Sequence, residues 1–232
     1  MTTETLTVTT PAGSFKAYVA RPAAAKAPAV VVIQEIFGVN KVMRDICDDL
    51  AAQGYLAICP DLFWRIEPGV DITDQSDAEW KKAFELYNAF DVDAGVSDIA
   101  STIDLIRADP GCSGKVGSVG FCLGGLLSFL TATRTDADAS VCYYGVGIDK
   151  FVAEADKIVH PLVLHIAEED QFVPKPAQDV ITGALKNRAG IEIFTYPGRD
   201  HAFARKGGEH YDAADAATAE GRTLALFKSA LS

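Results

Sequence analysis

The sequence is poor in the features that link proteins to nucleic acids or membranes. Its 21 lysines and arginines are outnumbered by 32 aspartates and glutamates, so its net charge is −11 and it lacks a surface that would neutralise phosphates. No apolar run approaches the roughly 20 residues that cross a bilayer. Residues 1–10 are polar and rich in threonine, without the basic and apolar segments of a signal peptide. We expect a cytoplasmic protein that binds neither nucleic acid nor membrane.

Paired cysteines and clustered metal ligands are also missing. The five cysteines are odd in number, widely spaced and never form a Cys-x-x-Cys pair; they are Cys47, Cys59, Cys112, Cys122 and Cys142. This spacing is typical of free thiols in a reducing compartment rather than of a disulfide framework or a zinc site. The sequence contains neither a histidine–carboxylate cluster nor a glycine-rich phosphate loop. We therefore expect no metal and no cofactor.

Hydrophobic residues, by contrast, are abundant at 49%, enough for a large core. From Ala29 onward, short apolar runs alternate with segments of helical periodicity, which predicts a mostly parallel sheet covered on both faces. Two alternating segments, 5–10 and 14–21, predict an antiparallel hairpin before it. The further predicted strands are 29–33, 55–59, 115–119, 139–144, 161–166 and 191–196. The predicted helices are 41–53, 77–89, 90–108, 175–188 and 209–231, with one more after residue 122.

These elements predict an α/β fold with a mostly parallel sheet of about eight strands and helices on both faces. The sequence contains no repeat, low-complexity tract or linker that would divide it. We expect a single domain over residues 1–232. Residues 62–76 have no clear period, and we expect them to form an excursion over the carboxyl edge of the sheet.

The most informative stretch follows the predicted strand 115–119. Gly120-Phe121-Cys122-Leu123-Gly124 has the spacing of a nucleophile elbow, with cysteine in place of the usual serine. Glycines allow the helix to pass close to the strand, and the turn would expose Cys122 at a helix N-terminus, where peptide dipoles favour a thiolate. The alternative is a tight turn that holds an inert, packed cysteine.

A thiol nucleophile requires a base, and the base requires an orienting partner. Of the four histidines, His201 lies in a loop just beyond a predicted strand, where the catalytic groups of open α/β sheets gather. The others are assigned to the core (His165) and to the surface (His160 and His210). Asp170 ends an acidic run after another strand, and the Val-Pro step after it would fix its loop. The order Cys122, Asp170, His201 is that of α/β hydrolases.

Two positions would supply the oxyanion hole, which in this fold uses the N–H after the nucleophile and one from the loop after an earlier strand. These are Leu123 and Ile36. The residue before Ile36 is Glu35, an acid placed directly after the buried strand 29–33. It is either a buried acid paired with a lysine or arginine, or a base that takes the proton of Cys122 when substrate arrives.

With these residues in place, the sequence resembles the dienelactone hydrolases (carboxymethylenebutenolidases) of the α/β-hydrolase superfamily over nearly its whole length. The segments that carry the resemblance are Gln34-Glu35-Ile36-Phe37-Gly38, Gly120-Phe121-Cys122-Leu123-Gly124-Gly125, Tyr143-Tyr144-Gly145, Asp170 with Phe172-Val173-Pro174, and His201 with Phe203-Ala204-Arg205. The combination of a cysteine in the elbow with Glu-Ile-Phe-Gly is specific to few α/β hydrolases.

The resemblance implies a Cys-His-Asp triad formed by Cys122, His201 and Asp170, with Glu35 as the active-site glutamate of the family and Arg205 as the arginine that binds the substrate carboxylate. The family also offers a second arginine, but here the matching position is Trp80, and a serine that is common after the histidine is replaced by Ala202. The neighbouring lysines could supply charge but not a bidentate fork. The further residues that we assign to substrate binding are Phe37, Tyr144, Lys81 and Lys82.

The resemblance implies hydrolysis of the enol-lactone ring of 4-carboxymethylenebut-2-en-4-olide to maleylacetate, through a thioester on Cys122. A thiolate expels an enolate more readily than an amine or alkoxide, which also favours enol lactones and activated esters. We expect a monomer that acts on a small anionic lactone or ester. The alternatives are a general carboxylesterase, a hydrolase of a different lactone, and a non-catalytic relative that binds a ligand or senses redox state through Cys122.

Overall fold

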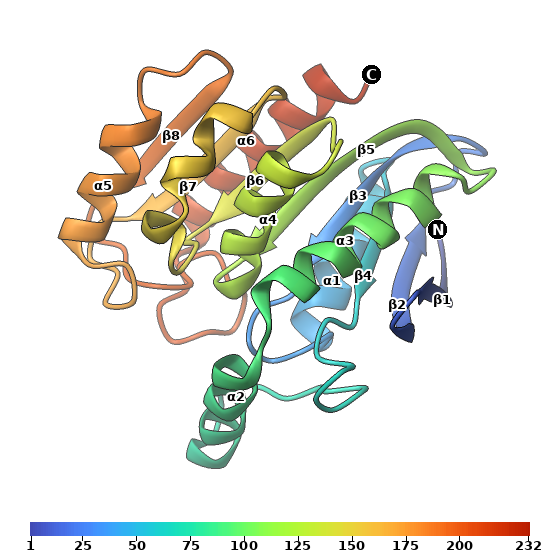
Figure 1. Ribbon diagram of the computed structural model, residues 1–232, viewed down its shortest axis with the longest axis horizontal. Coiled ribbons are helices and arrows are strands. Elements are labelled where there is room, and N and C mark those ends of the chain that lie inside the picture. The colour runs from blue at the N-terminus through green and yellow to red at the C-terminus, as the bar shows by residue number, and fades with distance from the viewer. The chain divides into compact units, whose positions relative to one another are not determined.

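A computed structural model describes residues 1–232 and contains one eight-stranded sheet in the order β1-β2-β4-β3-β5-β6-β7-β8 (Figure 1). The pairs β1–β2 and β2–β4 are antiparallel, whereas β3–β4, β6–β7 and β7–β8 are parallel. The predicted fold class and the N-terminal hairpin are therefore confirmed.

The strands are β1 (Thr2–Thr10), β2 (Gly13–Arg21), β3 (Ala27–Ile33), β4 (Leu56–Pro60), β5 (Cys112–Phe121), β6 (Ala139–Tyr143), β7 (Leu162–Ala167) and β8 (Ile191–Tyr196). The helices are α1 (Lys41–Ala52), α2 (Asp77–Ala89), α3 (Val92–Arg107), α4 (Leu123–Arg134), α5 (Lys175–Leu185) and α6 (Ala213–Ala230). The chain divides into two parts, residues 1–117 and 118–232, which we describe separately. The expectation of a single domain stays a prediction.

In the first part, polar side chains cap the starts of three helices. Asn40, Ser76 and Asp91 each accept a hydrogen bond from a backbone N–H in the first turn of the helix that follows, which satisfies a donor that would otherwise lack a partner. Strand β3 is apolar and almost wholly buried, as its β-branched run predicts for a central parallel strand.

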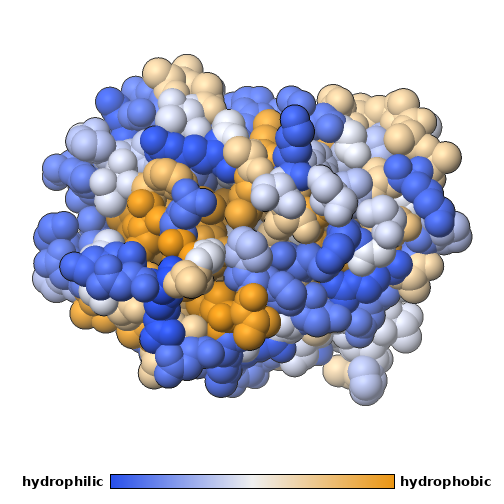
Figure 2. Space-filling view, turned by 90° about the horizontal axis from the view of Figure 1, so that it is seen from above, coloured by the Kyte–Doolittle hydropathy of each residue, from blue (hydrophilic) through white to orange (hydrophobic).

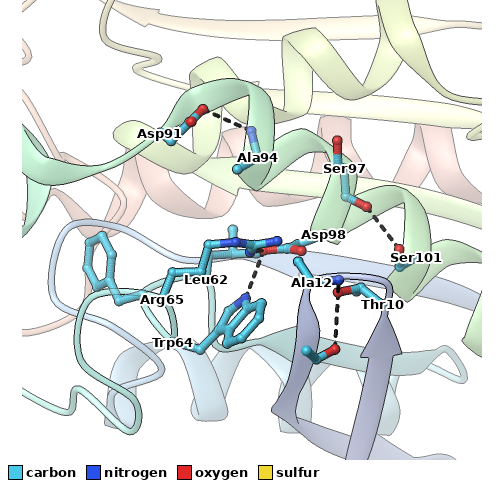
Figure 3. A network of polar contacts seen from close by, with 12 residues as sticks. Thr10, Ala12, Leu62, Trp64, Arg65, Asp91, Ala94, Ser97, Asp98 and Ser101 are labelled. Carbon is cyan, nitrogen blue, oxygen red and sulfur yellow. Dashed lines mark hydrogen bonds and ion pairs between the residues drawn. The ribbon is translucent and has the colours of Figure 1, made fainter.

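Residues 62–76 contain no helix or strand, and their start is held by polar and aromatic contacts. The ring of Trp64 stacks on Phe15 with 5.5 Å between centroids, and its indole N–H donates to Asp98 at 2.8 Å. Arg65 lies over the indole ring and pairs with the same carboxylate (Figure 3). Because Asp98 belongs to α3 and Phe15 to β2, these contacts fix the segment to two elements of the first part.

In the second part, β6, β7 and β8 lie side by side, and α4 and α6 both pack against β6 (Figure 1). His165 of β7 is buried, and its ring nitrogens lie 2.8 Å from the Tyr196 hydroxyl and 3.2 Å from the Thr223 hydroxyl. Burial lowers the pKa of His165 to about 3, so the ring is neutral. The assignment of His165 to the core is confirmed.

Some element boundaries differ from the prediction. Helix α6 begins at Ala213 rather than at residue 209, because the side chain of Asp212 caps it by accepting from the backbone N–H of Ala214 and Asp215. His210, which was expected in the first turn of this helix, lies in the loop before it and is half-buried rather than on the surface. Two short 3-10 helices, Ile148–Lys150 and Val152–Lys157, were not predicted.

The surface of the molecule is largely hydrophilic on one face. On the face shown in Figure 2, hydrophilic residues predominate, and strongly hydrophobic residues gather mainly in one area. None of the helices combines the length and apolar character needed to span a bilayer.

Candidate active site

Cys122 lies between the last residue of β5 and the first residue of α4, at a turn with φ 57° and ψ −115°. A non-glycine residue with positive φ is strained, and such residues cluster at functional sites. The surrounding backbone holds the turn in place. Cys122 N–H donates to the carbonyl of Tyr143 at 3.1 Å, and the carbonyl of Cys122 accepts from Gly125 at 3.0 Å. The sharp strand-to-helix turn expected from the glycine pattern is present, but Cys122 is buried rather than exposed as expected, with 9% of the residue accessible to solvent.

The glycines on either side of Cys122 are required by close backbone packing. A Cβ at position 120 would lie 1.8 Å from the carbonyl oxygen of Gly124, and one at position 125 would lie 2.5 Å from the carbonyl oxygen of Tyr143. Both neighbours are backbone atoms, which cannot move aside as the end of a side chain can. The turn therefore depends on the absence of side chains at these two positions.

The Gly120→Ala variant should lose about 2–3 kcal/mol or more of unfolding free energy, since overpacking against backbone costs this much or more. Urea denaturation measures the change. The matched control is Gly183→Ala in α5, where a Cβ would meet no atom within 4 Å. We expect this control to be neutral or more stable by up to about 1 kcal/mol, because alanine has the higher helix propensity. Equal stability of the Gly120→Ala variant and the wild type would contradict the close packing.

Asp170 and His201 are brought together by loops after β7 and β8. Both residues are buried, and His201 Nδ1–H donates to Asp170 Oδ2 at 2.8 Å. The other carboxylate oxygen, Oδ1, accepts from the backbone N–H of Phe172 at 2.8 Å and of Val173 at 3.1 Å. The bonds of Oδ1 to its own loop thus orient the carboxylate so that Oδ2 faces the imidazole. Of the three acids at 168–170, Asp170 is the buried one.

The electrostatics of His201 link it to Cys122 as well as to Asp170. Burial, the largest effect, lowers the pKa of the imidazole, but the charge of Cys122 and hydrogen bonds to Asp170 and Cys122 outweigh it and raise the pKa to about 10. These surroundings thus favour the protonated, imidazolium form of His201. Because the folded pKa of His201 lies above its unfolded value of 6.5, the protonated imidazole stabilises the folded state fully below pH 6.5. This stabilisation is lost as the pH rises through the folded pKa of about 10.

Aromatic rings hold the imidazole on two sides. The ring centroid of Tyr144 lies 5.1 Å from that of His201, and the ring of Phe172 lies 4.9 Å away, each edge to face. Tyr144 is buried at the end of β6, with φ 37°. Its ring lies against those of His201 and Phe203, and the assignment of Tyr144 to substrate binding stays a prediction.

Two residues beside His201 that were not predicted fix its loop. Asp200 Oδ1 accepts from the backbone N–H of His201 at 2.6 Å and of Gln171 at 3.2 Å, which ties the His201 loop to the Asp170 loop. Arg199 pairs with Asp212 and Asp215, each at 2.7 Å, at the start of α6. In the sequence, the only signal for Arg199 and Asp200 was that two oppositely charged residues directly precede His201.

The other predicted residues divide between the two parts of the chain. Glu35, Ile36 and Phe37 lie after β3 in the first part, at 2–4% exposure, and Gln34 holds their loop by accepting from the N–H of Leu62 at 3.0 Å. Leu123 and Arg205 are buried in the second part. Lys81 and Lys82 lie on α2 and pair with Glu85 and Glu67. Their assignment to substrate binding stays a prediction.

No group of three or more histidines, cysteines or carboxylates is placed to hold a metal ion. The thiol of Cys122 interacts with the imidazole of His201, which in turn is bonded to the carboxylate of Asp170. This arrangement suits acyl transfer to a thiol.

The parallel sheet with its strained turn after β5 and the imidazole–carboxylate pair beyond β7 and β8 define an α/β hydrolase. The profile of the dienelactone hydrolase family matches residues 15–231. A carboxymethylenebutenolidase of Pseudomonas putida is 41% identical over 211 residues, covering 91% of this chain and 89% of the relative. An Azospirillum brasilense protein, provisionally named a carboxymethylenebutenolidase, is 50% identical over 230 residues, covering 94% of this chain and 95% of the relative.

A crystal structure from Klebsiella pneumoniae subsp. pneumoniae MGH 78578, of a protein provisionally named a dienelactone hydrolase, superposes with a TM-score of 0.85 at 28% identity, covering 98% of each chain. The chain therefore belongs to the dienelactone hydrolase family, and it is a hydrolase.

Proposed function

We propose that this hydrolase opens the ring of an anionic enol lactone of the dienelactone type, giving a product of the maleylacetate type through a thioester on Cys122. The observation that carries the proposal is the hydrogen-bonded pair of His201 and Asp170, with Cys122 as the charge partner of the imidazole. Membership of the dienelactone hydrolase family supports the substrate class.

The chemistry proceeds in two stages. The Cys122 thiolate attacks the lactone carbonyl carbon, and the ring C–O bond breaks. The released enolate takes up the proton of the His201 imidazolium to become a ketone that stays tethered to the acyl group, which leaves the imidazole neutral. His201, oriented by Asp170, then removes a proton from water, which attacks the thioester and releases the carboxylate product and the thiol. Water is thus added once across the ester bond, and the enzyme returns to its starting state.

Charge that develops on the carbonyl oxygen would be stabilised by the N–H groups of Leu123 and Ile36. Leu123 is the first residue of α4, where N–H groups have no partner within the helix and the helix dipole favours negative charge. In enzymes of this type, the loss of one such donor costs about 2.7–4 kcal/mol in the barrier.

Glu35 is proposed as the base that removes the thiol proton of Cys122 when substrate binds. Its side chain is buried in the loop after β3, next to the proposed oxyanion donor Ile36. Arg205, also buried, is proposed to hold the substrate carboxylate by a bidentate pair.

The Glu35→Gln variant should lose about 100-fold in kcat, a typical effect of removing a general base, and its alkylation by iodoacetamide should follow a different pH profile from that of the wild type. Turnover and alkylation rates across pH provide the measurement. The control is Glu67→Gln, an exposed acid that pairs with Lys82, which should leave both unchanged. If Glu35→Gln matches the wild type in both respects, Glu35 is a buried structural acid.

The substrate class is tested by comparing cis- and trans-dienelactone with 4-nitrophenyl acetate. The proposal predicts a kcat/KM for at least one dienelactone that exceeds that for the acetate ester. A preference for the simple ester would favour a general carboxylesterase, and no hydrolysis of either would favour a non-catalytic protein. We further propose a monomer located in the cytoplasm, where five free cysteines would stay reduced; light scattering of the purified protein tests the monomer.

A further inference from the structure

The loop that bears Glu35 and Ile36 continues into an aromatic cluster, which we define as Phe37, Trp80 and Phe84. The ring centroids of Phe37 and Trp80 lie 5.1 Å apart, edge to face, and those of Trp80 and Phe84 lie 5.6 Å apart with 26° between the rings. Phe37 is buried, Trp80 is half-buried, and 40% of Phe84 is exposed. The cluster thus runs from the loop of the proposed oxyanion donor to solvent.

The orientation of the indole is fixed. Trp80 N–H donates to the carbonyl of Asp74 at 3.0 Å, so the only polar atom of its side chain is already engaged. What remains available on the ring is apolar surface. An aromatic ring that is rigid and partly exposed binds flat apolar groups well, because little conformational freedom is lost when the contact forms.

The helix that carries the cluster has little free positive charge to offer a carboxylate. Its only basic residues are Lys81 and Lys82, and each is paired with an acid. At 100° per residue, Lys82 projects about 200° around α2 from Trp80, onto the other side of the helix, whereas Phe84 falls on the same side as Trp80. Lys82 therefore lies away from the side of α2 that carries the two rings, whereas Lys81, about 100° from Trp80, is paired with Glu85.

We infer that Trp80 and Phe84 determine specificity for a planar, uncharged substituent on the lactone, such as an aryl or conjugated alkenyl group, while Arg205 is left as the site for any carboxylate. This inference rests on the proposed function, because it is the role of Ile36 as an oxyanion donor that places Phe37 and its ring partners beside the reacting carbonyl.

The test uses two enol lactones that share one ring and differ in the exocyclic group, which is a carboxylate in dienelactone and a phenyl ring in 5-benzylidenefuran-2-one. The readout is the ratio of kcat/KM for the phenyl lactone to that for dienelactone. The Phe84→Ala variant should lower this ratio about tenfold, the loss of one good aromatic contact. Trp80→Phe, which keeps a ring at this position, should change it less than about threefold.

The matched control is Val180→Ala in α5, which also truncates an exposed apolar side chain and should leave the ratio unchanged. A second readout does not require turnover. In the Cys122→Ala, Trp64→Phe double variant, Trp80 is the one remaining tryptophan, and its fluorescence should be quenched by the phenyl lactone with saturation but not by dienelactone.

An unaltered kcat/KM ratio in Phe84→Ala would overturn the inference. It would also be overturned if Lys81→Ala or Lys82→Ala lowered dienelactone turnover more than Phe84→Ala does. These failures are distinguishable from failure of the proposed function. Hydrolysis that persists in Cys122→Ala contradicts the thioester mechanism, whereas Cys122-dependent hydrolysis with an unaltered ratio contradicts only the role of the aromatic cluster.

Discussion

Cys122→Ala should reduce kcat for lactone hydrolysis by about 10⁴-fold or more, the scale found when the nucleophile of a covalent hydrolase is removed. The reason is geometric as well as chemical. Cys122 is the residue at the strained turn, at the N-terminus of α4, and its side chain is hydrogen-bonded to His201. No other thiol is placed beside an imidazole in this way, so nothing could replace it.

The measurement is the steady-state rate of lactone hydrolysis by Cys122→Ala and by a control variant with the same lactone. The matched control is Cys112→Ala, which removes a buried thiol from the other end of the same strand and should keep activity within about twofold. Both cysteines are buried, but their hydrogen-bond partners differ, because the thiol of Cys112 is bonded to the backbone of Gly114 and Lys115 rather than to an imidazole. Comparable losses in the two variants would point to damage to the sheet instead of loss of a nucleophile.

Asp170→Asn should slow turnover by about 10³–10⁴-fold while the first acylation event persists. The asparagine carbonyl can still accept from the N–H groups of Phe172 and Val173, as Asp170 Oδ1 does now. Its amide NH₂ would then face Nδ1 of His201 and force the imidazole into the wrong tautomer, an effect of about 10⁴-fold in serine proteases. The thioester would form but hydrolyse slowly, because His201 could no longer act as base toward water.

With 4-nitrophenyl acetate as substrate, the Asp170→Asn variant should give a pre-steady-state burst of 4-nitrophenolate followed by a slow phase. The burst reports formation of the thioester, and the slow phase reports its hydrolysis. The control is Glu168→Gln, which neutralises a half-buried acid two residues away in the same loop. It should leave both phases close to those of the wild type. If Asp170→Asn retains full steady-state turnover, the carboxylate serves only to hold its own loop.

The order of the helices and strands was predictable from the sequence, because hydrophobic periodicity and the turn or capping residues that end an element are local signals. Helix α2 and strand β8 have the predicted bounds, since each is bracketed by turn or capping residues next to a clear pattern. Strand β1 was expected from residue 5 but begins at Thr2, where Thr2 pairs with Arg21 across the hairpin. A polar terminal segment becomes a strand only because a partner strand is present, and no local pattern records this.

For the site, the sequence indicated the candidates but not their partners. Cys122, Asp170 and His201 could be chosen by motif and order, because the α/β-hydrolase chain order is fixed by topology. That Tyr144 turns its ring toward His201 depends on a φ of 37° after β6, and that Asp200 joins two loops depends on their approach in space. Such contacts between distant segments have no signature in a single sequence.

The central claim, a covalent thioester on Cys122, is tested most directly by mass spectrometry of the protein mixed with 4-nitrophenyl acetate and quenched in acid. In the Asp170→Asn variant, where deacylation should be slow, the account predicts one added acetyl group per chain, located on the peptide that contains Cys122. Steady release of 4-nitrophenolate without any acylated chain, or an acetyl group located on another residue, would contradict it.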